Sequence, residues 1–173
     1  MSELVIRRAL PGDASALVRL TRAVGAEPEG WLLATSEWRS PGAERRYLRS
    51  VRRSANAAVF LAEDGEQIVA RLSIARDPHP ASFHVASLGL MVAKSHRRRG
   101  LGQALLAQAV EWAREVGVSK LELYVFPHNE AAIALYESFG FEREGYRRHQ
   151  YRRAGELVDA VVMAYEITPT LSR

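Results

Sequence analysis

The sequence predicts a mixed α/β fold in a single domain, with a mostly antiparallel sheet flanked by helices. Its 173 residues correspond to about one domain of ordinary size, and 47% hydrophobic with 25% charged residues suits a globular core. Strand-like runs joined by tight turns indicate hairpins, and a strand–helix–strand unit between them requires a parallel pair. We expect one domain over residues 1–173, with its core over 4–167.

The first elements predicted are one strand and two helices. Residues 4–8 favour a short strand, and the Pro-Gly-Asp turn after them ends in Asp13, a predicted N-cap for a helix that reaches about Val24. Several glycines and prolines in the segment 25–41 predict a loop with short helical pieces. The amphipathic pattern over 43–53 predicts the second helix.

Three strands follow in succession. Apolar runs over 57–63 and 67–76 meet at Asp64-Gly65, a two-residue hairpin signal because both positions tolerate a positive φ. A further strand is predicted from Phe83 to about Val92. We expect these strands to run antiparallel to one another.

A helix and a buried strand complete the central unit. Apolar residues recur at intervals of three or four residues along one helical face, which ends near Gly117. The residues of that face are Leu101, Leu105, Ala109, Trp112 and Val116. The apolar run over 121–126 predicts a buried strand that pairs in parallel with the strand before the helix.

The last elements predicted are a short helix and a hairpin. The helix covers 129–139 and ends at Gly140. Two strands, 141–153 and 156–167, meet at Ala154-Gly155. The predicted order of elements is therefore βααβββαβαββ.

The composition excludes several classes of chemistry. Without cysteine there is no disulfide scaffold, thiolate zinc site or cysteine nucleophile, and the five histidines lack metal-ligand spacing, so we expect no metal. No apolar run reaches the ~20 residues of a membrane span and no leader pattern is present, so we expect a cytoplasmic protein without a membrane partner. The net charge of +4 is locally concentrated at Arg97–Arg99, which favours a focused anion site.

The segment from Ser87 to Gln103 carries the strongest functional signal, because an apolar strand leads through a basic turn with glycines into a helix. Gly100 and Gly102 permit close approach of backbone to a ligand, and the first amides of a helix favour an anion. Arginines in the turn add charge-assisted hydrogen bonds. A pyrophosphate is the ligand that this pattern predicts.

Two familiar phosphate loops fit this segment less well. A P-loop needs Lys-Ser or Lys-Thr after its second glycine, and neither follows here. The dinucleotide fingerprint is met at Gly100 and Gly102, but Leu105 stands at the third glycine position. Glu122, about twenty residues further on, leaves this alternative open.

The segment resembles the phosphate loop of the GNAT superfamily of acyl-CoA-dependent N-acetyltransferases, whose motif is Arg/Gln-x-x-Gly-x-Gly/Ala. Here the motif spans Arg97–Gly102 and follows Leu90–Val92, at the place of the family's cofactor-binding strand. A second family motif, with Asn, Leu-Tyr and Gly-Phe, matches residues 129–141, and the order of elements also matches. Lys94, where many members carry proline, is a departure that we expect to alter only the turn.

The resemblance implies acetyl transfer from acetyl-CoA to a primary amine of a small molecule, amino acid or protein. The absence of cysteine favours direct attack in a ternary complex over an acyl-enzyme. Pantetheine would form hydrogen bonds along the open edge of the strand at Leu90–Val92. A backbone amide there, from Leu90 or Met91, would polarise the thioester carbonyl. Asn129 would reach the pantetheine arm and Tyr136 would stand near the thioester sulfur. The implied pyrophosphate ligands are Arg97, Arg98, Arg99, Gly100, Leu101, Gly102 and Gln103.

The chemistry suits these residue types. The amine must lose a proton, attack the acetyl carbonyl and expel a thiolate, and a phenol with a pKa near 10 can protonate that sulfur. Tyr136 is therefore the catalytic candidate, although its place on an apolar helix face also fits a core aromatic. Asn129 also fits a simple helix N-cap.

Residues that would bind the acceptor or act as general base are less distinctive. Glu27, Glu29 and Trp31 lie in the loop where this superfamily often builds its acceptor site, and His84 lies near the start of the central strand. Each also fits an ordinary structural role, and a water chain to solvent is an alternative base.

Two alternatives from other classes remain. The arginines and tyrosines over 143–153 would suit nucleic-acid binding, but an alternating strand places such charges on both faces of a hairpin, so we expect no nucleic-acid partner. A non-catalytic acyl-CoA-binding module would keep the phosphate loop without turnover. The resemblance further implies a homodimer.

Overall fold

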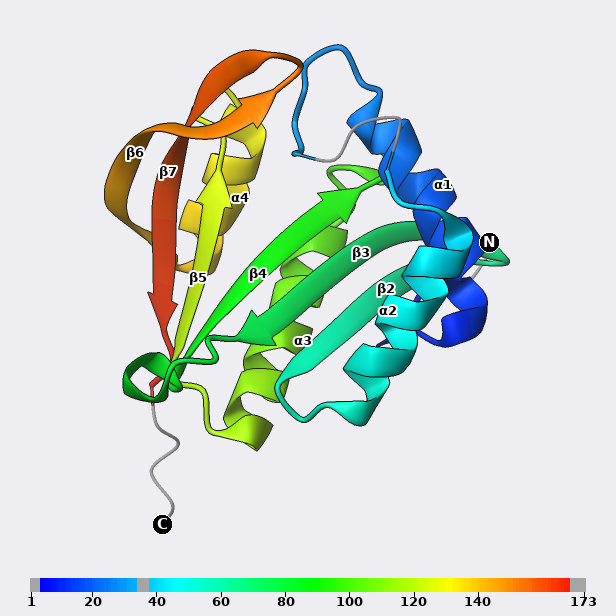
Figure 1. The fold of residues 1–173 in the computed structure, drawn as a ribbon, viewed down its shortest axis with the longest axis horizontal. Coiled ribbons are helices and arrows are strands. Elements are labelled where there is room, and N and C mark those ends of the chain that lie inside the picture. The colour runs from blue at the N-terminus through cyan, green and yellow to red at the C-terminus, as the bar shows by residue number, and fades with distance from the viewer. Residues whose placement is uncertain (1–3, 34–37, 169–173) are drawn as a thin grey trace. The chain divides into compact units, whose positions relative to one another are not determined.

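The computed structural model describes residues 4–33 and 38–168. Over the described residues its helices and strands follow the order β1-α1-α2-β2-β3-β4-α3-β5-α4-β6-β7 (Figure 1), which confirms the predicted order. The seven strands form a mixed sheet in the order β1-β2-β3-β4-β5-β7-β6. The predicted mixed α/β fold class is therefore confirmed.

Strand pairing explains why the sheet is mixed. The pairs β1–β2, β5–β7 and β6–β7 are antiparallel, and of these three β6–β7 is a hairpin. β4 and β5 are parallel, with Val85–Ser87 opposite Lys120–Glu122. This is the parallel pair that the strand–helix–strand unit predicted.

The residues divide into two compact units, each of which is described by itself. Unit 1 comprises residues 1–73 and 90–108, and unit 2 comprises residues 74–89 and 109–173. Three elements contribute residues to both units, namely β3 (Gln67–Arg76), β4 (Val85–Val92) and α3 (Leu101–Val116). The single domain over 1–173 stays a prediction.

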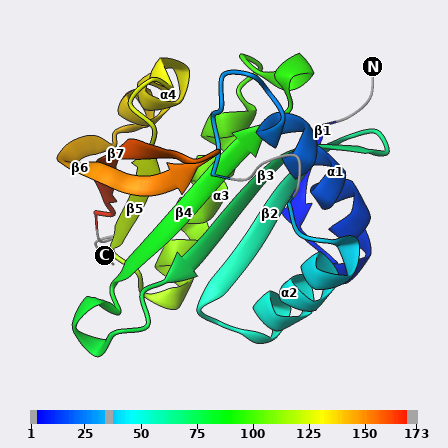
Figure 2. The same cartoon turned by 45° about the horizontal axis from the view of Figure 1, so that its top comes forward.

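Unit 1 contains two whole helices and the first part of α3, together with strands of the sheet. The bounds are Leu4–Arg8 for β1, Ala14–Gly25 for α1, Pro41–Arg53 for α2 and Ala57–Asp64 for β2. Aliphatic side chains from both helices and β2, among them Leu17, Leu48 and Leu61, form one buried core. Figure 2 shows α1 and α2 lying beside these strands.

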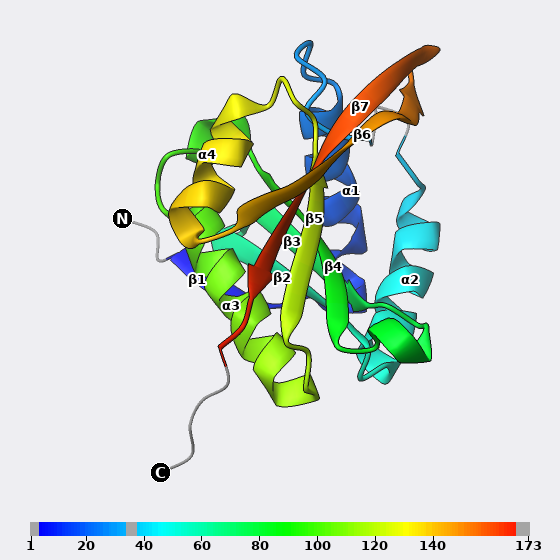
Figure 3. The ribbon, with the colours of Figure 1, turned by 90° about the vertical axis from the view of Figure 1, so that its left-hand side faces the viewer.

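Unit 2 contains β5, the helix of the second family motif (α4) and a long hairpin. The bounds are Lys120–Val125 for β5, Glu130–Phe139 for α4, Glu142–Arg153 for β6 and Glu156–Glu166 for β7. Along β5, buried Leu121, Leu123 and Val125 alternate with half-buried residues, so one face of this strand is covered and the other is partly open. Figure 3 shows β7 beside β5, with the β6–β7 hairpin extending past the end of β5.

Two local predictions need comment. Asp13 is the N-cap residue of α1, as predicted, but its carboxylate makes no capping hydrogen bond, because it accepts hydrogen bonds from the backbone of Leu10 at 2.7 Å and from Arg7 at 2.8 and 2.9 Å. The predicted place of the hairpin turn after β2 is wrong. β2 includes Asp64, so the hairpin turn falls on Gly65-Glu66 with a φ of +61° at Gly65. A positive φ at the first central position is typical of a type II′ turn.

The other predicted boundaries agree with the structure to within two residues. The largest differences are at α2, which begins at Pro41 behind the N-cap Ser40, and at β4, which begins at Val85 after a 3₁₀ turn. The predicted turn at Ala154-Gly155 is confirmed, with φ of +50° and +84° as a type I′ turn requires.

Candidate active site

The predicted phosphate loop lies in unit 1, where β4 leads into α3. After the 3₁₀ turn Lys94–His96, the backbone takes left-handed φ values of +62° at Arg98 and +80° at Gly100. Leu101 begins α3, and Ala104 N–H donates to the carbonyl of Gly100 at 3.0 Å. The N–H groups of the first helical turn have no acceptor within the helix, so they can donate to an anion at the turn.

Arg97, the first residue of the loop motif, is held by the protein itself. Its Nε donates to the carbonyl of Val92 at 3.0 Å. Its two terminal nitrogens donate to the two carboxylate oxygens of Glu27 at 2.8 and 2.6 Å. This bidentate pair joins residues 70 apart in the chain and ties the loop after α1 to the phosphate loop.

The next two arginines have different surroundings. Arg98 is exposed, and no hydrogen bond or ion pair of its side chain with another described residue is found. Arg99 lies 3.5 Å from the carboxylate of Asp64, which also contacts His96 Nε2 at 3.0 Å. Of the three adjacent arginines, Arg98 has its charge least committed within the protein.

Glu27 is an ionised partner of Arg97. Its side chain is 11% exposed, and one carboxylate oxygen also accepts a hydrogen bond from Trp31 Nε1 at 2.9 Å. Burial would raise the pKa of Glu27, but the hydrogen bonds and charge of Arg97 and the bond from Trp31 hold this pKa below its usual value. A carboxylate stabilised in this way is a weak proton acceptor, which argues against Glu27 as the general base.

Leu90–Val92 lie half-buried at the end of β4. The sulfur of Met91 accepts a hydrogen bond from the hydroxyl of Thr21 at 3.6 Å, and its side chain packs against the core of unit 1. The register of β4 with β5 extends only to Ser87, so Leu90 and Met91 follow the part of β4 that pairs with β5.

Asn129 and Tyr136 belong to α4 in unit 2. Asn129 caps the helix, because its Oδ1 accepts from Ala132 N–H at 3.2 Å. Tyr136 is 5% exposed, with Phe141 at a ring-centroid distance of 5.6 Å, and burial raises its pKa well above the usual value. Seven residues are about two helical turns, so the two side chains share one face of α4.

The remaining candidates are spread over the molecule. Glu29 is exposed and Trp31 is half-buried, both in the loop after α1. His84 is exposed in the turn before β4, and its carbonyl accepts from Ser119 and Lys120 N–H at 2.9 and 3.1 Å. His84 therefore directly precedes β4 and is not part of the strand.

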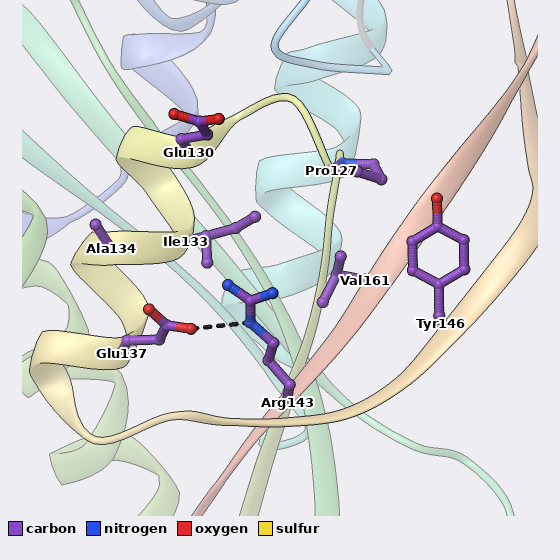
Figure 4. A pocket seen from close by; sticks show the side chains of 8 residues that line it. All are labelled: Pro127, Glu130, Ile133, Ala134, Glu137, Arg143, Tyr146 and Val161. Carbon is purple, nitrogen blue, oxygen red and sulfur yellow. Dashed lines mark hydrogen bonds and ion pairs between the residues drawn. The ribbon is translucent and has the colours of Figure 1, made fainter.

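A pocket of about 390 Å³ lies in unit 2 between α4 and the β6–β7 hairpin (Figure 4). Its lining includes Glu130, Ala134 and Glu137 from one face of α4, and Arg143, whose Nε donates to Glu137 at 2.9 Å. None of the predicted site residues lines it. We therefore do not assign the reaction to this pocket.

Sequence reasoning missed a cluster on the open face of β5, which we call the Tyr124 cluster. It consists of Glu122, Tyr124, Arg147 and Tyr151. The alternation of apolar and polar residues along 120–125 could have placed Glu122 and Tyr124 on one face. The partners from β6 could not be found in this way, because they depend on the hairpin's register.

Neither a membrane-spanning helix nor a metal cluster is found among the described residues. No helix there is long and apolar enough to cross a membrane. No group of three or more histidine, aspartate or glutamate side chains in that part of the chain could hold a metal ion.

The mixed sheet defines an α/β protein with a basic, glycine-containing turn between β4 and α3. Residues 26–141 match the acetyltransferase (GNAT) family. The chain therefore belongs to this family, and it is an acyltransferase that transfers an acetyl group to an amine.

Individual relatives support this assignment. The L-amino acid N-acetyltransferase AaaT of Escherichia coli (strain K12) is 34% identical over 168 residues, which are 95% of this chain and 98% of the relative. The ribosomal protein bS18-alanine N-acetyltransferase of Salmonella typhimurium is 34% identical over 117 residues, which are 63% and 78% of the two chains. A GNAT-family acetyltransferase from Streptococcus pneumoniae has a solved structure with a TM-score of 0.87 and 28% identity, covering 96% of this chain and 100% of that one. The predicted family, fold and class of reaction are confirmed.

Proposed function

We propose that the protein transfers the acetyl group of acetyl-CoA to a primary amine of an amino acid, another small molecule or a protein, by direct attack in a ternary complex. The observation that carries this proposal is the turn between β4 and α3. There, left-handed backbone at Arg98 and Gly100 leads directly into the N-terminus of α3. A pyrophosphate at that point would accept hydrogen bonds from backbone N–H groups and from arginine side chains, and the helix dipole would stabilise its negative charge.

Within this proposal, residues 98–103 bind the pyrophosphate of acetyl-CoA. Arg97 supports the turn through Glu27 and Val92, where three of its N–H groups are already used. The N–H of Leu90 or Met91 holds the thioester carbonyl and the oxyanion that forms from it. Asn129 reaches the pantetheine arm with its amide nitrogen, since its oxygen caps α4.

Tyr136 is the proposed general acid. The neutral amine attacks the acetyl carbonyl, the carbon–sulfur bond breaks, the thiolate takes the phenolic proton, and the proton on nitrogen leaves to solvent, which also reprotonates the phenol. The support for this role is the place of Tyr136 on the same face of α4 as Asn129. Burial raises the pKa of Tyr136, which keeps the phenol protonated but makes it a weaker acid.

The acceptor is proposed from the relatives, whose names specify an L-amino acid and the alanine of a ribosomal protein. Both acceptors carry an α-amino group, on the carbon that is bonded to a carboxyl or carbonyl carbon. We further propose that the protein acts in the cytoplasm as a homodimer. Size-exclusion chromatography with light scattering would test the dimer.

The test is thiol release from acetyl-CoA, measured with a thiol reagent against panels of amino acids, polyamines, aminoglycosides and peptides. The protein contains no cysteine, so it adds no background signal. Wild type should release thiol with at least one amine class, whereas Gly102→Trp should lose acetyl-CoA binding because its indole would fill the start of α3. Unchanged affinity of that variant would contradict the proposed loop. Tight binding of acetyl-CoA by wild type without turnover of any amine would instead favour a non-catalytic binding module.

A further inference from the structure

The Tyr124 cluster occupies the face of β5 that the core leaves open. Glu122 and Tyr124 are half-buried on that face, opposite buried Leu121 and Leu123. Glu122 is also the last residue of β5 in register with β4, opposite Ser87. Its carboxylate therefore stands at the point where the parallel pair ends.

Tyr124 lies between groups of opposite charge. Its hydroxyl donates to Glu122 Oε1 at 3.1 Å. The guanidinium carbon of Arg147 lies 5.1 Å from the centroid of the same ring, within the range of a cation–π contact. An anionic and a cationic group are thus held at the hydroxyl and at the face of one aromatic ring.

The guanidinium of Arg147 retains its hydrogen-bonding capacity. Arg147 is exposed, and no described residue accepts a hydrogen bond from its side chain. Its planar fork of N–H groups matches the two oxygens of a carboxylate. Stacking on Tyr124 restricts the orientation of the guanidinium, which lowers the entropy lost when a carboxylate binds.

An irregular stretch of β6 brings a second aromatic residue to the same place. Between Arg147 and Tyr151 the register shifts, so that four residues of β6 advance against two of β7. His149 at the shift has a φ of +52°, and its N–H donates to Asp159 at 2.7 Å. The ring of Tyr151 then meets Tyr124 edge to face, at a centroid distance of 6.4 Å and an angle of 83°.

We infer that the Tyr124 cluster binds a free α-amino acid as the acetyl acceptor, with Glu122 holding its ammonium group and Arg147 its carboxylate. The ammonium loses one proton to solvent, and the neutral amine then attacks the acetyl carbonyl. This inference rests on the proposed function and specifies the acceptor class. A protein N-terminus also has the ammonium group, but its α-carbonyl lies in a peptide bond and carries no charge. Arg147 therefore distinguishes amino acids from peptides.

The experiment compares acetylation of an L-amino acid with that of its α-carboxamide, for wild type, Arg147→Ala and the matched control Arg148→Ala. Arg148 is an exposed arginine on the same strand. In wild type, kcat/KM for the acid should exceed that for the amide by about 10- to 100-fold, the range for charge-assisted hydrogen bonds. Arg147→Ala should lower kcat/KM for the amino acid to the value for the amide and leave kcat/KM for the amide unchanged. Arg148→Ala should keep the wild-type ratio of the two kcat/KM values.

A second variant tests the ammonium site. Glu122→Gln should raise KM for both acceptors and keep their ratio, because both carry the amino group. Equal loss with acid and amide in Arg147→Ala would overturn the inference, and so would wild-type turnover of peptides or amides that matches turnover of the amino acid. In those cases acetyl transfer itself persists. Absence of turnover with every amine would overturn the proposed function and the inference with it.

Discussion

The pair of Glu27 and Arg97 allows a quantitative test of whether Arg97 supports the loop or binds phosphate. Two charge-assisted hydrogen bonds, 2.6 and 2.8 Å long, join side chains that are 11% and 32% exposed. Partial exposure screens such a pair, so we expect a coupling free energy of about 1–2 kcal/mol, roughly a 5- to 30-fold change in an equilibrium constant. Urea unfolding of Glu27→Gln, Arg97→Gln and the double variant measures this coupling.

The pH dependence of unfolding gives a second measure of the same pair. The pKa of Glu27 in the folded protein lies below its ordinary value of 4.5. The stabilisation from ionised Glu27 is therefore fully present above about pH 4.5 and is lost as the pH falls through the lower folded-state pKa. Glu27→Gln should remove this contribution and flatten the acid side of the stability profile.

Steady-state kinetics decide between the two roles of Arg97. If Arg97 supports the loop, Glu27→Gln and Arg97→Gln should have similar effects on KM for acetyl-CoA, and similar effects on KM for the amine. The double variant should then change either KM little more than a single variant does. If Arg97 is itself a phosphate ligand, Arg97→Gln alone should raise KM for acetyl-CoA about tenfold or more. That second pattern, or a coupling free energy near zero, would refute the reasoning.

Two further predictions concern α4. Tyr136→Phe should leave KM for acetyl-CoA near wild type and lower kcat about 100-fold or more, the range for loss of a general acid; a wild-type kcat in stopped-flow or steady-state assays would remove Tyr136 from the mechanism. Gly140→Ala should lower the free energy of unfolding by about 1–3 kcal/mol in thermal or urea denaturation, because Gly140 has a φ of +117° and an added Cβ would lie 3.1 Å from the ring of Tyr165. Unchanged stability in that variant would contradict the strained geometry.

The elements that were predictable are those set by neighbours in the sequence. The cap at Asn129, the left-handed stop at Gly140 and the turn at Ala154-Gly155 depend on rules that act over a few residues. Asp13 takes the predicted N-cap position, but its hydrogen bonds were not predictable, because Arg7 and Leu10 use its carboxylate in place of the helix amides. A side chain with several acceptable partners is therefore harder to predict than a backbone turn.

Contacts between distant segments were not predictable from the sequence. Arg147 and Tyr151 reach Tyr124 only because β6 pairs with β7 in a shifted register, and periodicity says nothing of that shift. The sequence placed Glu27 in the correct loop, but it did not predict the ion pair with Arg97, because the two residues are 70 positions apart in the chain. Side-chain roles at the site therefore depend on tertiary pairing, even where motifs identify the family.

The charge at the phosphate loop illustrates this limit. The sequence shows three adjacent arginines, which suggests three cations available to a pyrophosphate. In the structure Arg97 is neutralised by Glu27 and Arg99 lies near Asp64, so Arg98 contributes the least compensated charge. Within the proposed function, we expect binding of the pyrophosphate to depend more on backbone N–H groups at the start of α3 than on the number of arginines. This is why a glycine substitution in the turn, and not the loss of one arginine, should have the larger effect on acetyl-CoA binding.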